Sequence, residues 1–262
     1  MQKTAIITGA SSGIGAATAE QFLARGYSVI NIARRPSPVQ GVINIAADLS
    51  TDDGAVNAAQ ACIAHLQAES SEVALIHNAS LMLKDSAQSC ETEAIMRVLA
   101  VNVLAVNTLN RQLMTHMAAG SSVIFVGSTL SEKAVAGAYS YVVSKHAQLG
   151  QMRATCQDLI GSGIHTAMVC PGFTDTEMLK QHLGGDADLM VEIGSQNGFG
   201  RLDIITHTSS VVGDSPLIPD DSIASLIGPN QSFIHGITLL ELSRIGIQLS
   251  ELFTEVEVAI WG

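Results

Sequence analysis

Basic residues, and charged residues in general, are scarce in this sequence. Of its 262 residues 13 are Lys or Arg and 24 are Asp or Glu, which gives a formal net charge of -11 at pH 7. Nucleic-acid binding depends on clustered cations that neutralise phosphates, so we expect no nucleic-acid partner. Hydrophobic residues make up 47% of the chain. That share excludes a disordered chain and supplies enough apolar surface for a large core.

Long apolar runs and paired cysteines are also missing. No stretch approaches the roughly 18 uninterrupted apolar residues of a membrane span, and the N-terminus lacks the apolar region of a signal peptide. We therefore expect no membrane partner and a cytoplasmic location. The cysteines at positions 62, 90, 156 and 170 form no CxxC pair, and the eight histidines form no HExxH-like arrangement. The sequence therefore predicts reduced thiols and no metal site.

Short β-branched runs alternate with longer Ala-rich amphipathic stretches as far as about residue 170. We expect strands at 4–8, 28–32, 42–46, 73–77, 122–126 and 165–170, and helices at 13–25, 52–67, 92–117 and 139–160. This alternation predicts an α/β fold, a Rossmann-type doubly wound parallel sheet with helices on both faces. Gly26, Gly120 and Gly163 follow three of the helices, where a left-handed C-cap favours glycine. The length favours a single domain over residues 1–262.

The alternation stops after Pro171-Gly172. Residues 173–201 contain five glycines and leave the sheet at the edge where ligands of such folds bind, so we expect a substrate lid there. Residues 202–262 form an atypical C-terminal region, in which only a short helix at 220–227 and a last strand at 232–239 are expected.

A glycine-rich turn, Thr8-Gly9-Ala10-Ser11-Ser12-Gly13-Ile14-Gly15, joins the first strand to the first helix. Gly9 allows a tight turn, Gly13 lets backbone N–H groups approach a pyrophosphate, and Gly15 lets the helix pack closely. The free N–H groups and the dipole at the helix N-terminus attract an anion. We expect a dinucleotide at this turn, in contact with Gly9, Ser11, Ser12, Gly13, Ile14 and Gly15.

A Tyr–Lys pair lies on the helix expected at 139–160. Tyr141 and Lys145 are four residues apart and so share one helix face, where a cation favours the phenolate form of the tyrosine. Tyr139 lacks this arrangement, because Val143 lies four residues after it. Ser128 follows the strand at 122–126, at the carboxyl edge of the sheet, where its hydroxyl could polarise a substrate carbonyl.

The spacing TGxxxGxG, together with these residues, resembles the short-chain dehydrogenase/reductase family over residues 4–176. The resemblance implies that Tyr141 is the general acid–base and that Ser128 orients the carbonyl. It further implies that Lys145 lowers the pKa of the tyrosine and holds the nicotinamide ribose, and that Asn102 positions a water in a proton relay. The resemblance also implies further cofactor contacts. Asp48 and Leu49 would contact the adenine, and Tyr141 and Lys145 the ribose of the nicotinamide. Pro171, Gly172, Thr174 and Thr176 would lie at the nicotinamide carboxamide, and Asn78 and Ala79 are also expected to contact the cofactor.

The end of the second strand indicates which nicotinamide cofactor binds. It reads Ile32-Ala33-Arg34-Arg35, without the acidic residue that would bind the ribose 2′-OH of NAD. Arg34 is suited to bidentate binding of a 2′-phosphate. The sequence thus favours NADP, with NAD as the alternative.

The function predicted from these features is NADP-dependent interconversion of a carbonyl and a secondary alcohol on a small-molecule substrate. The resemblance also implies a homodimer or homotetramer. Two alternatives remain: a catalytically silent protein that senses NADP(H), and a sugar-nucleotide epimerase or dehydratase that uses the same Tyr–Lys pair. The presence of both Tyr141 and Lys145 favours an enzyme, and the loop spacing differs from the TGxxGxxG that is usual in the epimerases.

Overall fold

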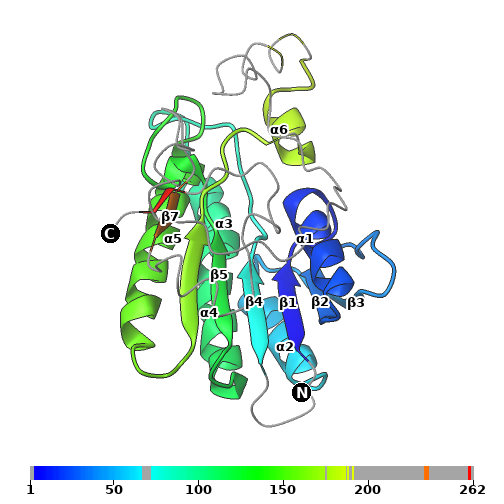
Figure 1. Cartoon of the computed structure of the whole chain (residues 1–262). Helices are drawn as coiled ribbons and strands as arrows, with labels where there is room; N and C mark the ends of the chain where they lie inside the picture. Colours follow the sequence, from blue (N-terminus) through cyan, green and yellow to red (C-terminus); the bar gives the residue numbers. More distant parts are fainter. Residues whose placement is uncertain are drawn as a thin grey trace, which may run out of the picture.

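Six parallel strands form the centre of the molecule (Figure 1). The structure is a computed structural model that describes residues 3–66, 72–174, 176–186, 188 and 191, and the backbone of 233–235 and 259–260. The strands are β1 (Thr4–Thr8), β2 (Ser28–Ala33), β3 (Ile43–Ala46), β4 (Val73–His77), β5 (Ser122–Val126) and β6 (His165–Val169), in the spatial order β3-β2-β1-β4-β5-β6. The order reverses between β1 and β4, as in a doubly wound fold. The predicted fold class and the bounds of these six strands, to within one residue, are confirmed.

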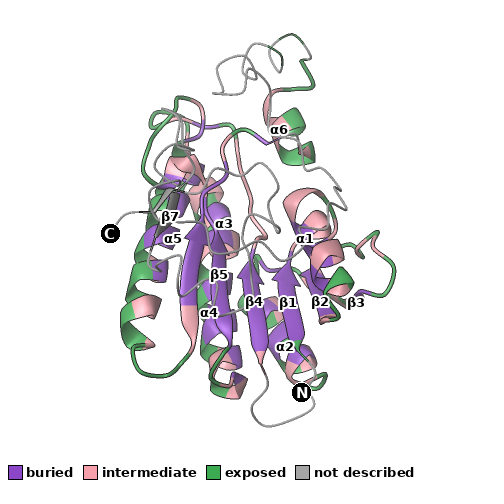
Figure 2. Cartoon of the chain, viewed as in Figure 1, coloured by how far each residue is buried: buried purple, intermediate pink, exposed green. Residues whose placement is uncertain are grey.

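Helices cover both faces of the sheet because alternate strand residues point in opposite directions. On one face, Ile7 packs in a cluster with Ala19 and Phe22 of α1 (Gly13–Ala24). On the other face, the cluster that contains Ile6 includes residues of α2 (Asp52–Ile63), α4 (Ala105–Leu113) and α5 (Tyr139–Asp158). Figure 2 shows the central strands as the buried layer of the molecule.

The helix expected at 92–117 is divided into four pieces. These are α3 (Thr92–Leu99), a π-turn η1 (Ala100–Leu104), α4, and a 3-10 turn η2 (Met114–His116). A π-turn inside a helix is rare and often lies at a functional site, and this one carries Asn102. Within the described residues, the run Thr92–His116 is the one helical stretch long and apolar enough to cross a membrane by length and composition. In the structure it packs along α2 and α5 as a layer of the fold.

The sheet continues beyond β6 with a strand of opposite direction. β7 (Phe233–His235) pairs antiparallel with β6, and β8 (Ala259–Ile260) pairs parallel with β7. A last strand was expected at 232–239, and β7 lies within that range; its antiparallel direction was not predicted. A strand of three residues carries no sequence signal for its direction. The helix expected at 220–227 lies outside the described residues.

The three glycines expected at helix ends have the left-handed backbone that the sequence predicts. The φ angles of Gly26, Gly120 and Gly163 are 80°, 93° and 75°. A side chain at these angles would be strained. Gly26 directly follows the C-cap of α1, whereas Gly120 and Gly163 lie four and five residues after the last residue of η2 and α5, so the expected helix cap is found at Gly26 only.

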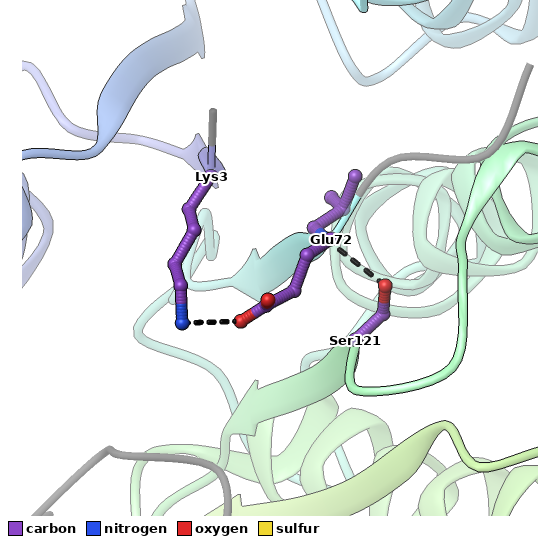
Figure 3. A network of polar contacts seen from close by, with 4 residues as sticks. Lys3, Glu72 and Ser121 are labelled. Carbon is purple, nitrogen blue, oxygen red and sulfur yellow. Dashed lines mark hydrogen bonds and ion pairs between the residues drawn. The ribbon is translucent and has the colours of Figure 1, made fainter. Parts of the chain in front are cut away.

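Polar contacts tie the amino-terminal edge of the sheet together (Figure 3). Lys3 Nζ lies 2.7 Å from Glu72 Oε1, and the N–H of Val73 donates to Ser121 Oγ at 3.0 Å. The hydrogen bond to Glu72 raises the pKa of Lys3. Both side chains of the ion pair are partly in water, so the pair contributes little to stability. This edge is opposite the carboxyl edge, where the candidate site lies.

Candidate functional site

Four residues expected to act in catalysis come from three elements and meet beside the carboxyl end of β5. Ser128 follows β5 and precedes the short turn η3 (Thr129–Ser131), Tyr141 and Lys145 lie on α5, and Asn102 lies on η1. Tyr141 is 8% exposed and Lys145 1% exposed. The Lys145 ammonium lies 5.5 Å from the centroid of the Tyr141 ring. The structure therefore brings the Tyr–Lys pair together on one helix face, as the spacing predicts.

The pKa of the Tyr141 phenol is higher than that of a free tyrosine. Burial raises its pKa to about 12, and the neighbouring hydroxyls of Ser128 and Ser80 offset part of that rise. The causes of this shift are burial and the neighbouring hydroxyls and thiol, so a lowering of the pKa of Tyr141 by Lys145 stays a prediction. At neutral pH the phenol is therefore protonated.

Lys145 is held by two acceptors inside the protein. Its Nζ donates to the Val126 carbonyl at 2.8 Å and to Gln148 Oε1 at 2.9 Å. Burial lowers its pKa to about 8, and the Cys170 thiol nearby acts in the opposite direction. An ammonium has three N–H donors, so one remains after these two bonds.

Three hydrogen bonds hold the side chain of Asn102. Its Oδ1 accepts from the Leu81 N–H at 2.7 Å, and its Nδ2 donates to the Leu81 carbonyl and to Ser144 Oγ, both at 2.9 Å. Ser144 in turn donates to the Tyr141 carbonyl at 2.7 Å. Asn102 thus joins the segment after β4 to the helix that carries the tyrosine.

The glycine-rich turn has the backbone that its sequence predicts. Gly9 and Gly13 have φ angles of 75° and 55°, and the N–H of Gly9 donates to the Ile32 carbonyl at 2.9 Å. Ser12 is the N-cap of α1 without a side-chain cap, and the first turn contains no acidic residue. The first N–H groups of α1, from Gly13 onward, are therefore not capped by Ser12, and no acidic side chain of that turn opposes an anion.

Gly15 is the point of closest approach between α1 and the strand ends. A Cβ there would collide with the Gly9 carbonyl and lie 2.5 Å from Asn78 Nδ2. Asn78 Nδ2 donates to the Thr8 carbonyl at 2.9 Å, and Thr8 Oγ1 accepts from the N–H groups of Asn78 and Ala79, both at 2.9 Å. Asn78 and Ala79, expected as cofactor contacts, therefore support the glycine turn from β4.

The candidate adenosine side lies at the ends of β2 and β3, which are paired through Ala33 and Ala46. Arg34 follows β2 and is exposed, while Asp48 follows β3 and is also exposed. Hydrogen bonds from Ser50 lower the pKa of Asp48, with a smaller contribution from the charge of Arg34. Leu49 is buried against the α2 side of the sheet.

The segment after β6 runs beside the turn and the catalytic residues. The Pro171 carbonyl accepts from the Thr129 N–H at 3.0 Å, and Thr174 Oγ1 donates to the Gly172 carbonyl at 3.3 Å. Thr176 caps α6 (Glu177–His182), and its methyl would lie 3.4 Å from a Cβ at Gly13. Thr176, which was expected at the nicotinamide carboxamide, thus lies against the glycine turn, and Figure 1 shows α6 above the ends of the strands. Most of the expected lid beyond residue 186 lies outside the described residues.

Sequence reasoning missed several residues that support the site. Asp85 Oδ1 accepts from the Ser140 N–H at 3.0 Å and so caps α5 from a distant loop. Asn31, buried within β2, accepts from the Ala10 N–H at 2.9 Å and holds the glycine turn. Gln148 binds the amine of Lys145. A polar residue inside a hydrophobic strand was a usable signal for Asn31, whereas the partners of Asp85 and Gln148 depend on the tertiary fold.

A doubly wound sheet with a glycine turn and a buried Tyr–Lys pair at one edge defines a nucleotide-binding oxidoreductase fold. The chain belongs to the short chain dehydrogenase family, whose sequence model matches residues 3–185. It is 34% identical over 200 residues to a 2-(R)-hydroxypropyl-CoM dehydrogenase of Xanthobacter autotrophicus, a match that covers 70% of this chain and 79% of that protein.

Further relatives agree with this family. A 3-oxoacyl-[acyl-carrier-protein] reductase of Salmonella typhimurium is 28% identical over 187 residues, which are 68% of this chain and 76% of that one. Among solved structures, a blue fluorescent protein from a metagenomic library in complex with NADPH superimposes with a TM-score of 0.69 at 26% identity. That alignment covers 78% of this chain and 85% of the other. The chain is therefore an enzyme of an oxidoreductase family.

Proposed function

We propose that this enzyme uses NADP to interconvert a carbonyl and a secondary alcohol on a small-molecule substrate. The observation that carries the proposal is the gathering of Ser128, Tyr141 and Lys145 at the carboxyl edge of the sheet, the edge at which the glycine turn also lies. These groups would offer a hydroxyl and a protonated phenol to a substrate carbonyl and an ammonium to a nicotinamide ribose.

The residues present fit a nicotinamide dinucleotide. The N–H groups at the start of α1 suit the pyrophosphate, since Ser12 makes no side-chain cap there and no acidic residue opposes an anion. Exposed Arg34, at the end of β2, would bind the 2′-phosphate of NADP. Structural neighbours are complexed with NADPH or NADH, which supports a nicotinamide cofactor, and the preference for NADP rests on Arg34.

The chemistry follows from the protonation state of Tyr141. When bound, the nicotinamide supplies the hydride for reduction and accepts it in oxidation. Ser128 Oγ accepts from the Leu130 N–H at 3.1 Å, which leaves its own O–H to donate to a substrate carbonyl oxygen. Tyr141 donates its proton to that oxygen, so the carbonyl becomes an alcohol. Because the pKa of Tyr141 is raised, the protein is prepared for reduction at neutral pH.

Lys145 and Asn102 serve the tyrosine in different ways. The remaining N–H of Lys145 would bind the nicotinamide ribose, and its charge would favour the phenolate as the proton leaves. Asn102 fixes α5 through Ser144, and the second lone pair of its Oδ1 could accept from a relay water, since its two Nδ2 donors are taken by Leu81 and Ser144. We place the chain in the cytoplasm as one domain that assembles into a homodimer or homotetramer.

A carbonyl panel tests the proposal. The purified protein is mixed with NADPH or NADH and with small ketones, 3-oxoacyl thioesters and, in the oxidative direction, 2-(R)-hydroxypropyl-CoM with NADP. We expect oxidation of NADPH with at least one carbonyl, and a slower reaction with NADH. Binding of NADPH without turnover of any compound would instead favour the NADP(H)-sensing alternative.

A further inference from the structure

The partner of Lys145 on its own helix is a glutamine. Gln148 lies three residues after Lys145 on α5, so the two side chains leave neighbouring positions on one helix face. The Gln148 side chain is fully buried, and its Oε1 accepts from Lys145 Nζ at 2.9 Å. Since the ammonium only donates, the amide oxygen must face it, which fixes the orientation of the glutamine.

Two acceptors with different origins hold this ammonium. The Val126 carbonyl belongs to the strand that ends at Ser128, whereas Gln148 Oε1 belongs to the helix that carries Tyr141. With two N–H groups taken, the direction of the third is determined. Val126 alone would leave the amine free to rotate about that single contact.

The geometry points to a positioning role for Gln148, and this inference rests on the proposed function. We propose that the side-chain oxygen of Gln148 holds the Lys145 amine charged and directed, so that its third N–H faces the cofactor ribose and its charge faces Tyr141. Gln148 itself touches no reacting atom. It acts through Lys145.

Packing alone is a poor explanation for a glutamine at this position. Leu149 and Met152 on the same helix are buried apolar residues. Gln148 instead brings an amide whose Nε2 has no hydrogen-bond partner within the described part of the chain. An apolar residue would fill the volume, but it would leave Lys145 without its second acceptor. The titratable groups that face Lys145 are Tyr141 from α5 and Cys170 from the end of β6.

Matched variants separate this role from a general effect on the helix. Gln148→Met removes the acceptor at similar volume, and Gln148→Glu keeps an acceptor and adds a negative charge. Gln151→Met is the control. Gln151 lies about one turn later on α5, and its Nε2 donates to the Val103 carbonyl at 3.0 Å, which is not one of the two acceptors of Lys145. Both glutamines have one bonded and one unbonded polar atom.

The direct measurement is the ¹³Cε chemical shift of Lys145, followed by NMR against pH in full-length protein and assigned by its loss in Lys145→Met. We expect its titration midpoint to fall by about one pH unit in Gln148→Met, a tenfold change in proton affinity. It should rise in Gln148→Glu and stay unchanged in Gln151→Met. NADPH affinity at pH 7, measured by fluorescence titration, should fall about tenfold in Gln148→Met and less than twofold in Gln151→Met.

The outcomes distinguish this inference from the proposed function. An unchanged Lys145 titration in Gln148→Met, or equal changes in Gln148→Met and Gln151→Met, would overturn the role of Gln148. If wild-type protein failed to bind NADPH, the proposed function would fail, whereas the titration of Lys145 would still decide whether Gln148 holds its charge.

Discussion

Replacing Lys145 by Met should stabilise the protein while it abolishes function. Lys145 is buried, and its pKa is lowered from 10.5 to about 8. A shift of that size corresponds to about 3 kcal/mol of unfavourable free energy for the charged form in the folded state at neutral pH. Loss of the bonds from Nζ to Val126 and Gln148 costs about 1 kcal/mol each. The net expectation is a gain of about 1–2 kcal/mol in the free energy of unfolding at pH 7.

The pH dependence of this gain has a definite sign. Because the pKa of Lys145 is lower in the folded protein, the unfolded chain binds more protons between about pH 8 and pH 10.5, and the stability of the wild-type protein rises across that window on account of this residue. The advantage of Lys145→Met should therefore shrink from pH 8 upward. Tyr141, whose pKa is raised, acts in the opposite direction at higher pH, but it is present in both proteins and largely cancels in the difference.

Urea unfolding of both proteins at a series of pH values is the assay, with NADPH binding as the functional readout. The variant should unfold at higher urea than the wild type at pH 7, with a difference that narrows toward pH 10, and it should bind NADPH weakly. A variant less stable than the wild type at pH 7, or a difference that is independent of pH, would refute the reasoning that the buried charge is kept at the expense of stability.

Three further predictions concern the cofactor site and the direction of the reaction. Arg34→Ala should weaken NADPH relative to NADH by about 1.5–3 kcal/mol in titrations of both cofactors, and equal losses would show that this side chain does not bind the 2′-phosphate. Gly15→Ala should reduce NADPH affinity at least about 100-fold by displacing the Gly9 carbonyl, while Gly150→Ala, where a Cβ meets nothing within 4 Å, should be neutral or add up to about 1 kcal/mol of stability. Alcohol oxidation should accelerate with rising pH, because it needs the phenolate of Tyr141, whereas carbonyl reduction should be level up to about pH 8 and fall as Lys145 loses its proton. A pH-independent oxidation rate would contradict this assignment.

The core of the fold was predictable because it depends on local patterns. Parallel strands buried on both faces read as compact β-branched runs, and the left-handed turn at Gly9 requires glycine whatever surrounds it. The same holds for the Tyr–Lys pair, since helical spacing alone places the two side chains on one face.

Features that depend on tertiary contacts were not predictable. The π-turn at Asn102 differs from an α-helix only in hydrogen-bond spacing, which has no signature in composition. The raised pKa of Tyr141 could not be read from the sequence, because it is caused by burial, which helical spacing does not reveal. Asp85 caps a helix that begins more than fifty residues later in the chain, and no local sequence pattern predicts a contact over that distance.

The central claim is that Tyr141 donates the proton in NADPH-dependent carbonyl reduction. The most direct test compares single-turnover oxidation of NADPH by wild-type protein, Tyr141→Phe and Tyr139→Phe with a carbonyl that the wild type reduces. Tyr139 is an exposed tyrosine two residues away on the same helix, so it controls for the loss of a phenol as such. We predict that Tyr139→Phe reacts like the wild type and that Tyr141→Phe binds NADPH normally but does not oxidise it. A Tyr141→Phe protein that reduces the carbonyl at the wild-type rate would contradict the account.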